Sequence, residues 1–105
     1  MSNENKSITT KAKSAIPLYI QNQLWYIFEL ANSNYEEIHY FELDIIKVES
    51  GNIMQKLVHK YTTHKKEYLY SDASPVKAIV VIASSLSSSG AIMMLGEEFV
   101  VPEGQ

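Results

Sequence analysis

The sequence predicts an α+β domain, in which one N-terminal helix packs on an antiparallel sheet of four to five strands. Three patterns point to this class. Apolar residues follow helical spacing over residues 17–31, apolar and polar residues alternate from Ile38 to Glu49, and Val76 to Ala83 is a nearly continuous apolar run rich in β-branched residues. A chain of 105 residues is the size of one domain and can bury a core without disulfides or metal.

The helix is predicted from Pro17 to Ala31, because proline suits the first turn and the asparagines at 32–34 supply a stop signal. Before it, residues 1–6 are polar and expected to be disordered, and Ser7 to Lys11 predict a short edge strand. The predicted buried face of the helix consists of Ile20, Leu24, Ile27, Phe28 and Ala31, with Leu18 and Trp25 at its edges.

The middle of the chain predicts a hairpin. Ile38 to Glu49 forms its first strand, the ESGN segment at 49–52 its turn, and Met54 to Thr62 its returning strand. The polar residues 63–66 predict a connection, and Glu67 to Tyr70 a short strand. The sequence leaves the register of the hairpin open.

Two more strands are predicted in the C-terminal part. Val76 to Ala83 is the expected central strand, the serine-rich segment 84–90 a turn, and Ala91 to Leu95 the last strand. The predicted order is β-α-β-β-(β)-β-β, and its short connections favour an antiparallel meander. We assign residues 7–100 to one domain and residues 101–105 to a C-terminal tail.

Composition narrows the classes of function. All nine basic residues are lysines, so the chain lacks the planar guanidinium that reads bases, and its net charge is −3. It has no cysteine, hence no disulfide, thiolate metal site or cysteine nucleophile. The N-terminal segment has no apolar stretch and the longest apolar run is the AIVVIA of residues 78–83, so we expect a cytoplasmic protein without a signal peptide or membrane span.

We predict no catalytic residue, no metal and no cofactor. His39, His59 and His64 lack metal-ligand spacing and are expected to be surface histidines on strands. The adjacent carboxylates at 36–37 and 97–98 are expected to be solvated charges. The serine cluster lacks the turn of a nucleophile, and the four glycines form no phosphate-binding loop.

One segment offers a nucleic-acid interpretation. Lysines alternate with aromatic residues around the end of the hairpin, as in grooves that bind single strands. The candidate residues are His59, Lys60, Tyr61, His64, Lys65 and Lys66. The competing interpretation, which the acidic net charge favours, is a hairpin strand with a solvated lysine face.

The helix offers a second interpretation. Tyr19, Asn22 and Tyr26 share one stripe, with Gln23 beside it, and the segment from Ile16 to Phe28 carries no charge. Depletion of charge with enrichment of tyrosine is typical of the centre of a protein interface. We therefore expect this stripe to face another protein or a second copy of the chain, unless other elements of the fold cover it. A membrane-surface helix is disfavoured, because it would carry lysine or arginine.

The segments TTKAKSAIPLYIQNQLW, YFEL, KEY and MMLGEEF span most of the chain. With them the chain resembles the small "staphylococcal protein of unknown function" family of Gram-positive bacteria and their mobile elements. The resemblance implies a bacterial, cytoplasmic context and a link to mobile elements, but no activity and no catalytic residues. Small acidic proteins of such elements include inhibitors that act by protein contact.

These observations predict a non-enzymatic protein-interaction module or accessory factor, of the inhibitor type found on mobile elements. The alternative is a weak single-strand nucleic-acid binder that uses the hairpin lysines. A small-molecule enzyme without a recognisable motif is the third interpretation.

Overall fold

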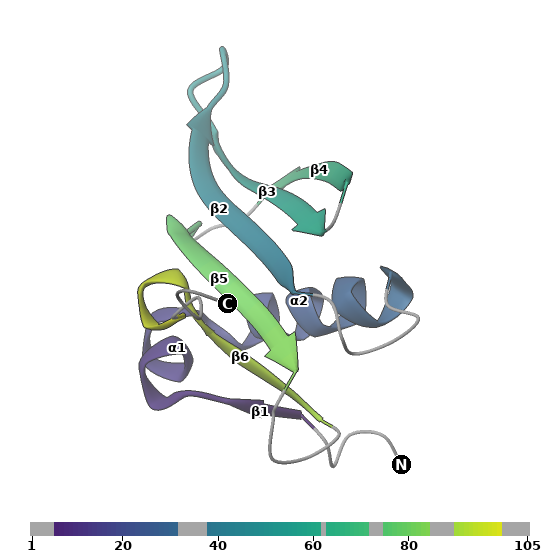
Figure 1. The fold of residues 1–105 in the computed structure, drawn as a ribbon. Helices are drawn as coiled ribbons and strands as arrows, with labels where there is room; N and C mark the ends of the chain where they lie inside the picture. The colour runs from purple at the N-terminus through teal and green to yellow at the C-terminus, as the bar shows by residue number, and fades with distance from the viewer. Residues whose placement is uncertain (1–5, 32–37, 62, 72–74, 85–89, 100–105) are drawn as a thin grey trace.

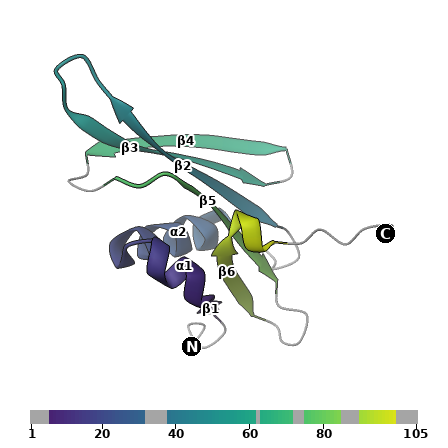
Figure 2. The same cartoon turned by 90° about the vertical axis from the view of Figure 1, so that its left-hand side faces the viewer.

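The computed structural model describes residues 6–31, 38–61, 63–71, 75–84 and 90–99. Its strands form one six-stranded sheet in the order β1-β6-β5-β2-β3-β4 (Figure 1). Both α-helices lie on the same side of this sheet (Figure 2), which confirms the α+β class. The elements are β1 (Lys6–Ile8), α1 (Thr10–Ala15), α2 (Leu18–Ala31), β2 (His39–Lys47), β3 (Ile53–Tyr61), β4 (His64–Ser71), β5 (Ala78–Ser84), β6 (Ala91–Leu95) and the 3-10 helix η2 (Gly96–Glu98).

The short helix α1 was not predicted. It begins after Thr9, whose side-chain oxygen accepts a hydrogen bond from the Ala12 N–H at 3.2 Å and so satisfies a free amide of the first turn. The prediction of one helix is therefore wrong, since the described residues contain two. The edge strand predicted over residues 7–11 is also wrong beyond Ile8, because the capped helix takes over from Thr10.

Helix α2 confirms the predicted helix almost residue for residue. Ile16, placed before Pro17, is extended (φ −111°, ψ 122°), and this separates α1 from α2. The Pro17 carbonyl then accepts hydrogen bonds from the Ile20 and Gln21 N–H groups, both at 3.0 Å. The Gln21 side chain is buried and donates to the Ile16 carbonyl at 2.6 Å, so it ties the start of α2 to the end of α1.

The sheet differs from the predicted meander in three respects. It has six strands instead of four or five, β1 runs parallel to β6, and β5 lies between β2 and β6 rather than beside β4. Strand β4 is also longer than predicted. His64, Lys65 and Lys66 were assigned to a connection but pair with β3, because backbone pairing needs no apolar side chains.

The hairpin of β2 and β3 pairs without interruption, with Tyr40 opposite Lys60 and Lys47 opposite Ile53. Its turn contains Gly51 at φ 94°, a conformation that residues with a Cβ rarely adopt. Glu42 faces Val58 rather than Lys60, yet the Lys60 Nζ reaches the Glu42 carboxylate at 2.6 Å along the diagonal.

The core lies between α2 and the face of the sheet that α2 covers. The helix contributes Ile20, Leu24, Ile27 and Phe28, four of the five residues predicted to be buried, while Ala31 is only partly buried. From the sheet, Phe41, Leu43, Leu57, Val80, Ile82, Ala91 and Met93 complete the same cluster. The inner side of α2 is thus fully used by the fold.

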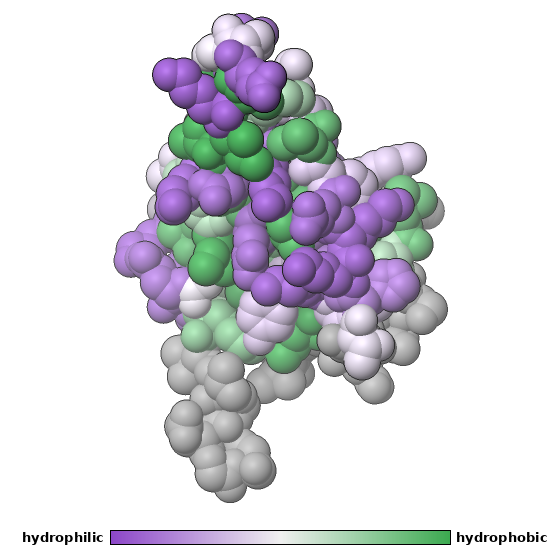
Figure 3. All heavy atoms as spheres, turned by 90° about the horizontal axis from the view of Figure 1, so that it is seen from above, coloured by the Kyte–Doolittle hydropathy of each residue, from purple (hydrophilic) through white to green (hydrophobic). Residues whose placement is uncertain are grey.

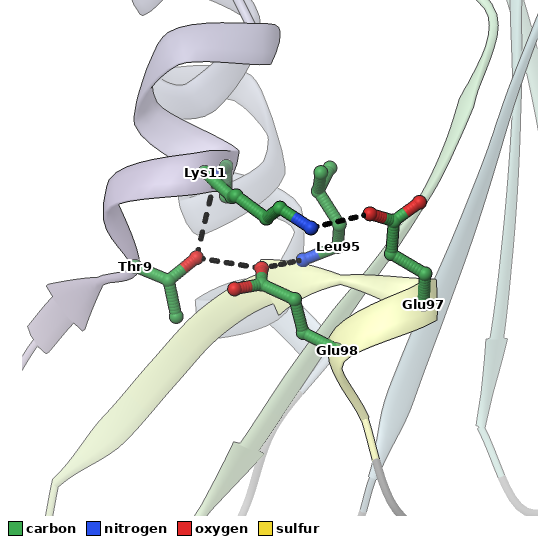
Figure 4. A network of polar contacts seen from close by, with 6 residues as sticks. Thr9, Lys11, Leu95, Glu97 and Glu98 are labelled. Carbon is green, nitrogen blue, oxygen red and sulfur yellow. Dashed lines mark hydrogen bonds and ion pairs between the residues drawn. The ribbon is translucent and has the colours of Figure 1, made fainter.

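The C-terminal end of β6 is linked to α1 by side chains (Figure 4). One oxygen of the Glu98 carboxylate accepts hydrogen bonds from the Thr9 hydroxyl at 2.8 Å and from the Leu95 N–H at 2.9 Å. These bonds, the backbone one first, lower the pKa of Glu98 below its usual value. Lys11 pairs with Glu97 at 2.9 Å beside them, so helix α1 and η2 are joined at one end of the sheet.

Several expectations fall on residues that are not described. They concern residues 1–5 of the N-terminus, the helix stop signal at 32–34, the carboxylates at 36–37, most of the serine-rich turn, and the tail at 101–105. Lys6, which was predicted to belong to the disordered N-terminus, instead begins β1.

Candidate interaction surface

The outer face of α2 is the most apolar exposed surface on any described helix. The most exposed large hydrophobic side chains of the described residues are Leu18 and Leu30 (both 69%) and Tyr26 (66%), and all three belong to α2. Tyr19 is 45% exposed, and Asn22 is also exposed. The stripe predicted from the sequence therefore faces outward.

The structure extends that stripe at both ends. The sequence pattern places Leu18 at the edge of the buried face and assigns Leu30 to neither face, whereas both side chains are exposed. Both lie on the row that contains Asn22 and Tyr26, because four residues span slightly more than one helical turn. Continuing the spacing beyond Tyr26 would have identified Leu30 from the sequence.

Charge is almost absent from this face. Within α2 the one charged residue is Glu29, at the edge of the stripe, and its carboxylate forms an ion pair with Lys6 of β1. Gln23, the fourth predicted interface residue, is only partly exposed, and its Oε1 is buried without a hydrogen-bond partner among the described residues. The outer face of α2 can therefore offer apolar contact and hydrogen bonds, but little electrostatic attraction.

The opposite side of the sheet has a different character. Figure 3 shows it over β2, β3 and β4 as mostly hydrophilic with separate hydrophobic patches. A groove of about 910 Å³ crosses this side. The Gly96 backbone packs closely against Ile79: a Cβ added at Gly96 would lie 2.8 Å from Ile79 Cγ2. This close approach, which glycine permits, lets η2 form one wall of the groove. Residues that line the groove include Tyr40, Glu42, Lys60, Lys77, Ile79 and Phe99.

The charges around this groove are largely satisfied within the protein. Lys60 pairs with Glu42 at 2.6 Å, and Lys77 lies 3.6 Å from Asp44. Each of the two carboxylates is therefore next to a lysine ammonium group. The described lining of the groove therefore combines ion-paired side chains with apolar ones such as Ile79 and Phe99.

The lysine-rich segment predicted to bind single strands is divided between the two sides of the sheet. Lys60 and Lys65 face each other on the side away from the helices. Tyr61 lies opposite His64, and His59 opposite Lys66, on the other side, where Lys66 stacks over Tyr68 at 5.4 Å. The structure thus does not gather the six candidate residues into one groove.

The histidines are where the sequence interpretation was wrong. His39 is 0% and His59 3% exposed, while only His64 lies on the surface as expected. His39 Nδ1 and His59 Nε2 are 2.9 Å apart, so one ring donates a hydrogen bond to the other. Their shared parity with Phe41 and Leu57, which point into the core, is the sequence pattern that could have placed them inside.

Aromatic rings surround this histidine pair. His39 stacks on Tyr61 (4.5 Å between centroids) and meets Phe28 of α2 edge to face (4.7 Å), and His59 stacks on Phe41 (4.6 Å). Burial lowers the pKa of His39 from 6.5 to about 4. Burial, followed by the neighbouring histidines, lowers the pKa of His59 to about 4 as well. Both rings are therefore neutral near pH 7.

In the part of the chain that the structure describes, the pair is not joined by the further ligands that a metal centre needs. Among the described residues no group of three or more histidine, aspartate or glutamate side chains could hold a metal ion. The remaining nitrogen of His39, Nε2, is buried and finds no hydrogen-bond partner in that part of the chain. Two imidazoles joined directly by a hydrogen bond leave no position for a cation between them.

None of the described helices is both long enough and apolar enough to cross a membrane. Comparisons of the chain with protein-family models, with curated proteins and with solved structures found no match.

Proposed function

We propose that this protein is a non-enzymatic interaction module that binds another protein through the outer face of α2. The observation that carries the proposal is the concentration of the most exposed large hydrophobic side chains, Leu18, Tyr26 and Leu30, on one side of one helix. Exposed apolar residues scattered singly are ordinary, whereas a contiguous uncharged stripe is typical of a docking surface.

The other side of α2 supports the same proposal. Leu24 and Phe28 are buried against the sheet, so the fold itself requires only the inner side. The outer residues therefore contribute little to stability in the free protein, where their apolar surface faces water. A partner that covers them would remove that surface from water, which favours association.

The resemblance noted in the sequence gives the proposal a setting. It supports a cytoplasmic accessory factor of a Gram-positive bacterium or mobile element, of the kind that inhibits an enzyme by contact. Single-strand binding remains the alternative, although the division of Lys60 and Lys66 between two sides of the sheet leaves it less favoured.

The proposal is tested by quantitative capture of proteins from a bacterial lysate on the immobilised chain. The variant Tyr26→Lys places a charge in the stripe, and Leu69→Lys places the same charge on an exposed leucine of β4 outside it. We expect a protein that binds the wild type and the Leu69 variant equally and is lost from the Tyr26 variant. Captured proteins that are all indifferent to Tyr26→Lys would contradict the proposal.

A further inference from the structure

The exposed row of α2 has the geometry of a helix-packing ridge. Leu18, Asn22, Tyr26 and Leu30 are each four residues apart. Such rows are inclined by about 26° to the helix axis, and two of them lie parallel when the helices cross at about 50°. The row can therefore lie in the groove beside an equivalent row of a second helix.

The row is also complementary to itself when its direction is reversed. If two α2 helices meet about a two-fold axis that passes between Asn22 and Tyr26, Leu18 of one copy lies beside Leu30 of the other. Asn22 then lies beside Tyr26, where the amide and the phenol can form a hydrogen bond. At the flank, the hydroxyl of Tyr19 lies beside the carboxylate of Glu29.

We propose that the partner of this surface is a second copy of the chain, bound as an antiparallel α2–α2 dimer. This inference rests on the proposed function, because it names the occupant of the same surface. It adds a defined register, with Asn22 of each copy against Tyr26 of the other.

The charge distribution favours a second copy over a charged partner. A two-fold axis brings two identical surfaces together, so a surface whose charges all have one sign would repel its own copy. The row carries none, although the whole chain has a net charge of −3. The nearby Glu29 is neutralised by its ion pair with Lys6. A nucleic acid or a strongly charged protein would instead find nothing opposite in sign on this face.

The area available sets the strength of the dimer. The exposed parts of Leu18, Tyr19, Tyr26 and Leu30, with Asn22, amount to on the order of 500 Å² in each copy. Two copies together bury about 1,000 Å², below the roughly 1,600 Å² of a standard stable interface. We therefore expect a reversible dimer with a dissociation constant in the micromolar range, on the order of 10–100 μM.

Sedimentation velocity of the full chain between about 1 μM and 1 mM measures this equilibrium. The wild type should shift from monomer to dimer over that range. Tyr26→Lys should raise the dissociation constant more than about 10-fold, because it leaves a lysine unpaired in a dry contact. The control variant Leu69→Lys should associate like the wild type. A wild-type chain that stays monomeric, or a dimer unaffected by Tyr26→Lys, overturns the inference.

A complementation experiment tests the register itself. Asn22→Glu and Tyr26→Lys should each weaken self-association. An equimolar mixture of the two variants should form a heterodimer, in which the introduced carboxylate of one chain meets the introduced ammonium group of the other across the axis. The second contact of this heterodimer keeps its wild-type residues. Restored association also shows that both variants are folded. If the mixture does not associate, the antiparallel pairing is wrong.

The dimer and the proposed function can fail separately. A monomeric chain that still captures another protein in a manner sensitive to Tyr26→Lys overturns the dimer and leaves the interaction module. A chain that neither self-associates nor captures a Tyr26-dependent partner overturns both.

Discussion

The buried histidine pair makes the stability of this protein depend on pH well above the range in which carboxylates titrate. His39 and His59 have an ordinary pKa of 6.5 when the chain is unfolded and a pKa of about 4 when it is folded. Between these values the unfolded chain binds more protons than the folded one, so acid favours unfolding. The stability is fully present above the unfolded pKa and is lost as the pH falls toward 4.

The size of the effect follows from the two protonation states. On lowering the pH from about 7.5 to about 5.5, each unfolded histidine gains between about 1 and 2 kcal/mol of protonation free energy that the folded protein does not share. The pair therefore lowers the free energy of unfolding by about 3 kcal/mol, a large part of a typical total of about 5–15 kcal/mol. The coupling between the rings does not enter at pH 5.5, because both folded rings are still neutral.

Urea denaturation at the two pH values measures the loss directly. With a slope of about 1–3 kcal/mol per molar urea, the midpoint should fall by roughly 1–3 M. The control variant His64→Gln, at the exposed histidine, should show nearly the same fall, because burial is the main cause of the low pKa of His59. The double variant His39→Phe/His59→Phe replaces both partners by rings of similar shape and should lose most of the pH dependence while remaining folded.

Two results would refute this reasoning. A wild-type midpoint that is equal at both pH values would mean that the rings are protonated in the folded protein or are exposed. A double variant that retains the full fall in midpoint would assign the pH dependence to other groups.

Two further predictions concern the two sides of α2 and the nucleic-acid alternative. Leu24→Ala, on the buried side, should lower the free energy of unfolding by about 2–5 kcal/mol in denaturant titrations. Tyr26→Lys, on the outer side, should change it by about 0.5 kcal/mol or less. Equal losses would place Tyr26 in the core. If the hairpin lysines bind single strands, fluorescence anisotropy with a labelled oligonucleotide should show an affinity that falls steeply with salt. Replacing Lys60, Lys65 and Lys66 together by glutamine should weaken that affinity. The absence of binding at low salt would remove this alternative.

The elements that the sequence predicted are those determined by local pattern. Helix α2 carries apolar residues at helical spacing over several turns, and the inner residues Leu24 and Phe28 follow directly from it. Helix α1 could not be found in this way, since Ala12 is its one buried residue. Its position depends on the cap at Thr9 and on Glu98, which lies far along the chain.

Non-local pairing explains the remaining differences. Nothing near β5 in the sequence indicates that it will lie beside β2. The segment just before β5 is held by the side chain of Gln55, which belongs to β3. Gln55 is fully buried, accepts a hydrogen bond from the Val76 N–H at 2.8 Å and donates to the Val76 carbonyl at 3.0 Å. A glutamine on a strand is expected to lie on the surface until the segment that it binds is known.

The histidine pair and the exposed row are connected through α2. Phe28, on the inner side of the helix, contacts the ring of His39, and Tyr26 lies two residues away on the outer side. The outer row presents its uncharged surface only while the inner residues pack α2 on the sheet. That packing becomes less stable in acid, because protons bind to the histidines of the unfolded chain. Association works in the opposite direction, because a second copy that binds only the folded form stabilises it by mass action. Acid and high protein concentration therefore have opposite effects on helix α2: acid favours its unfolding, and association favours its folded form.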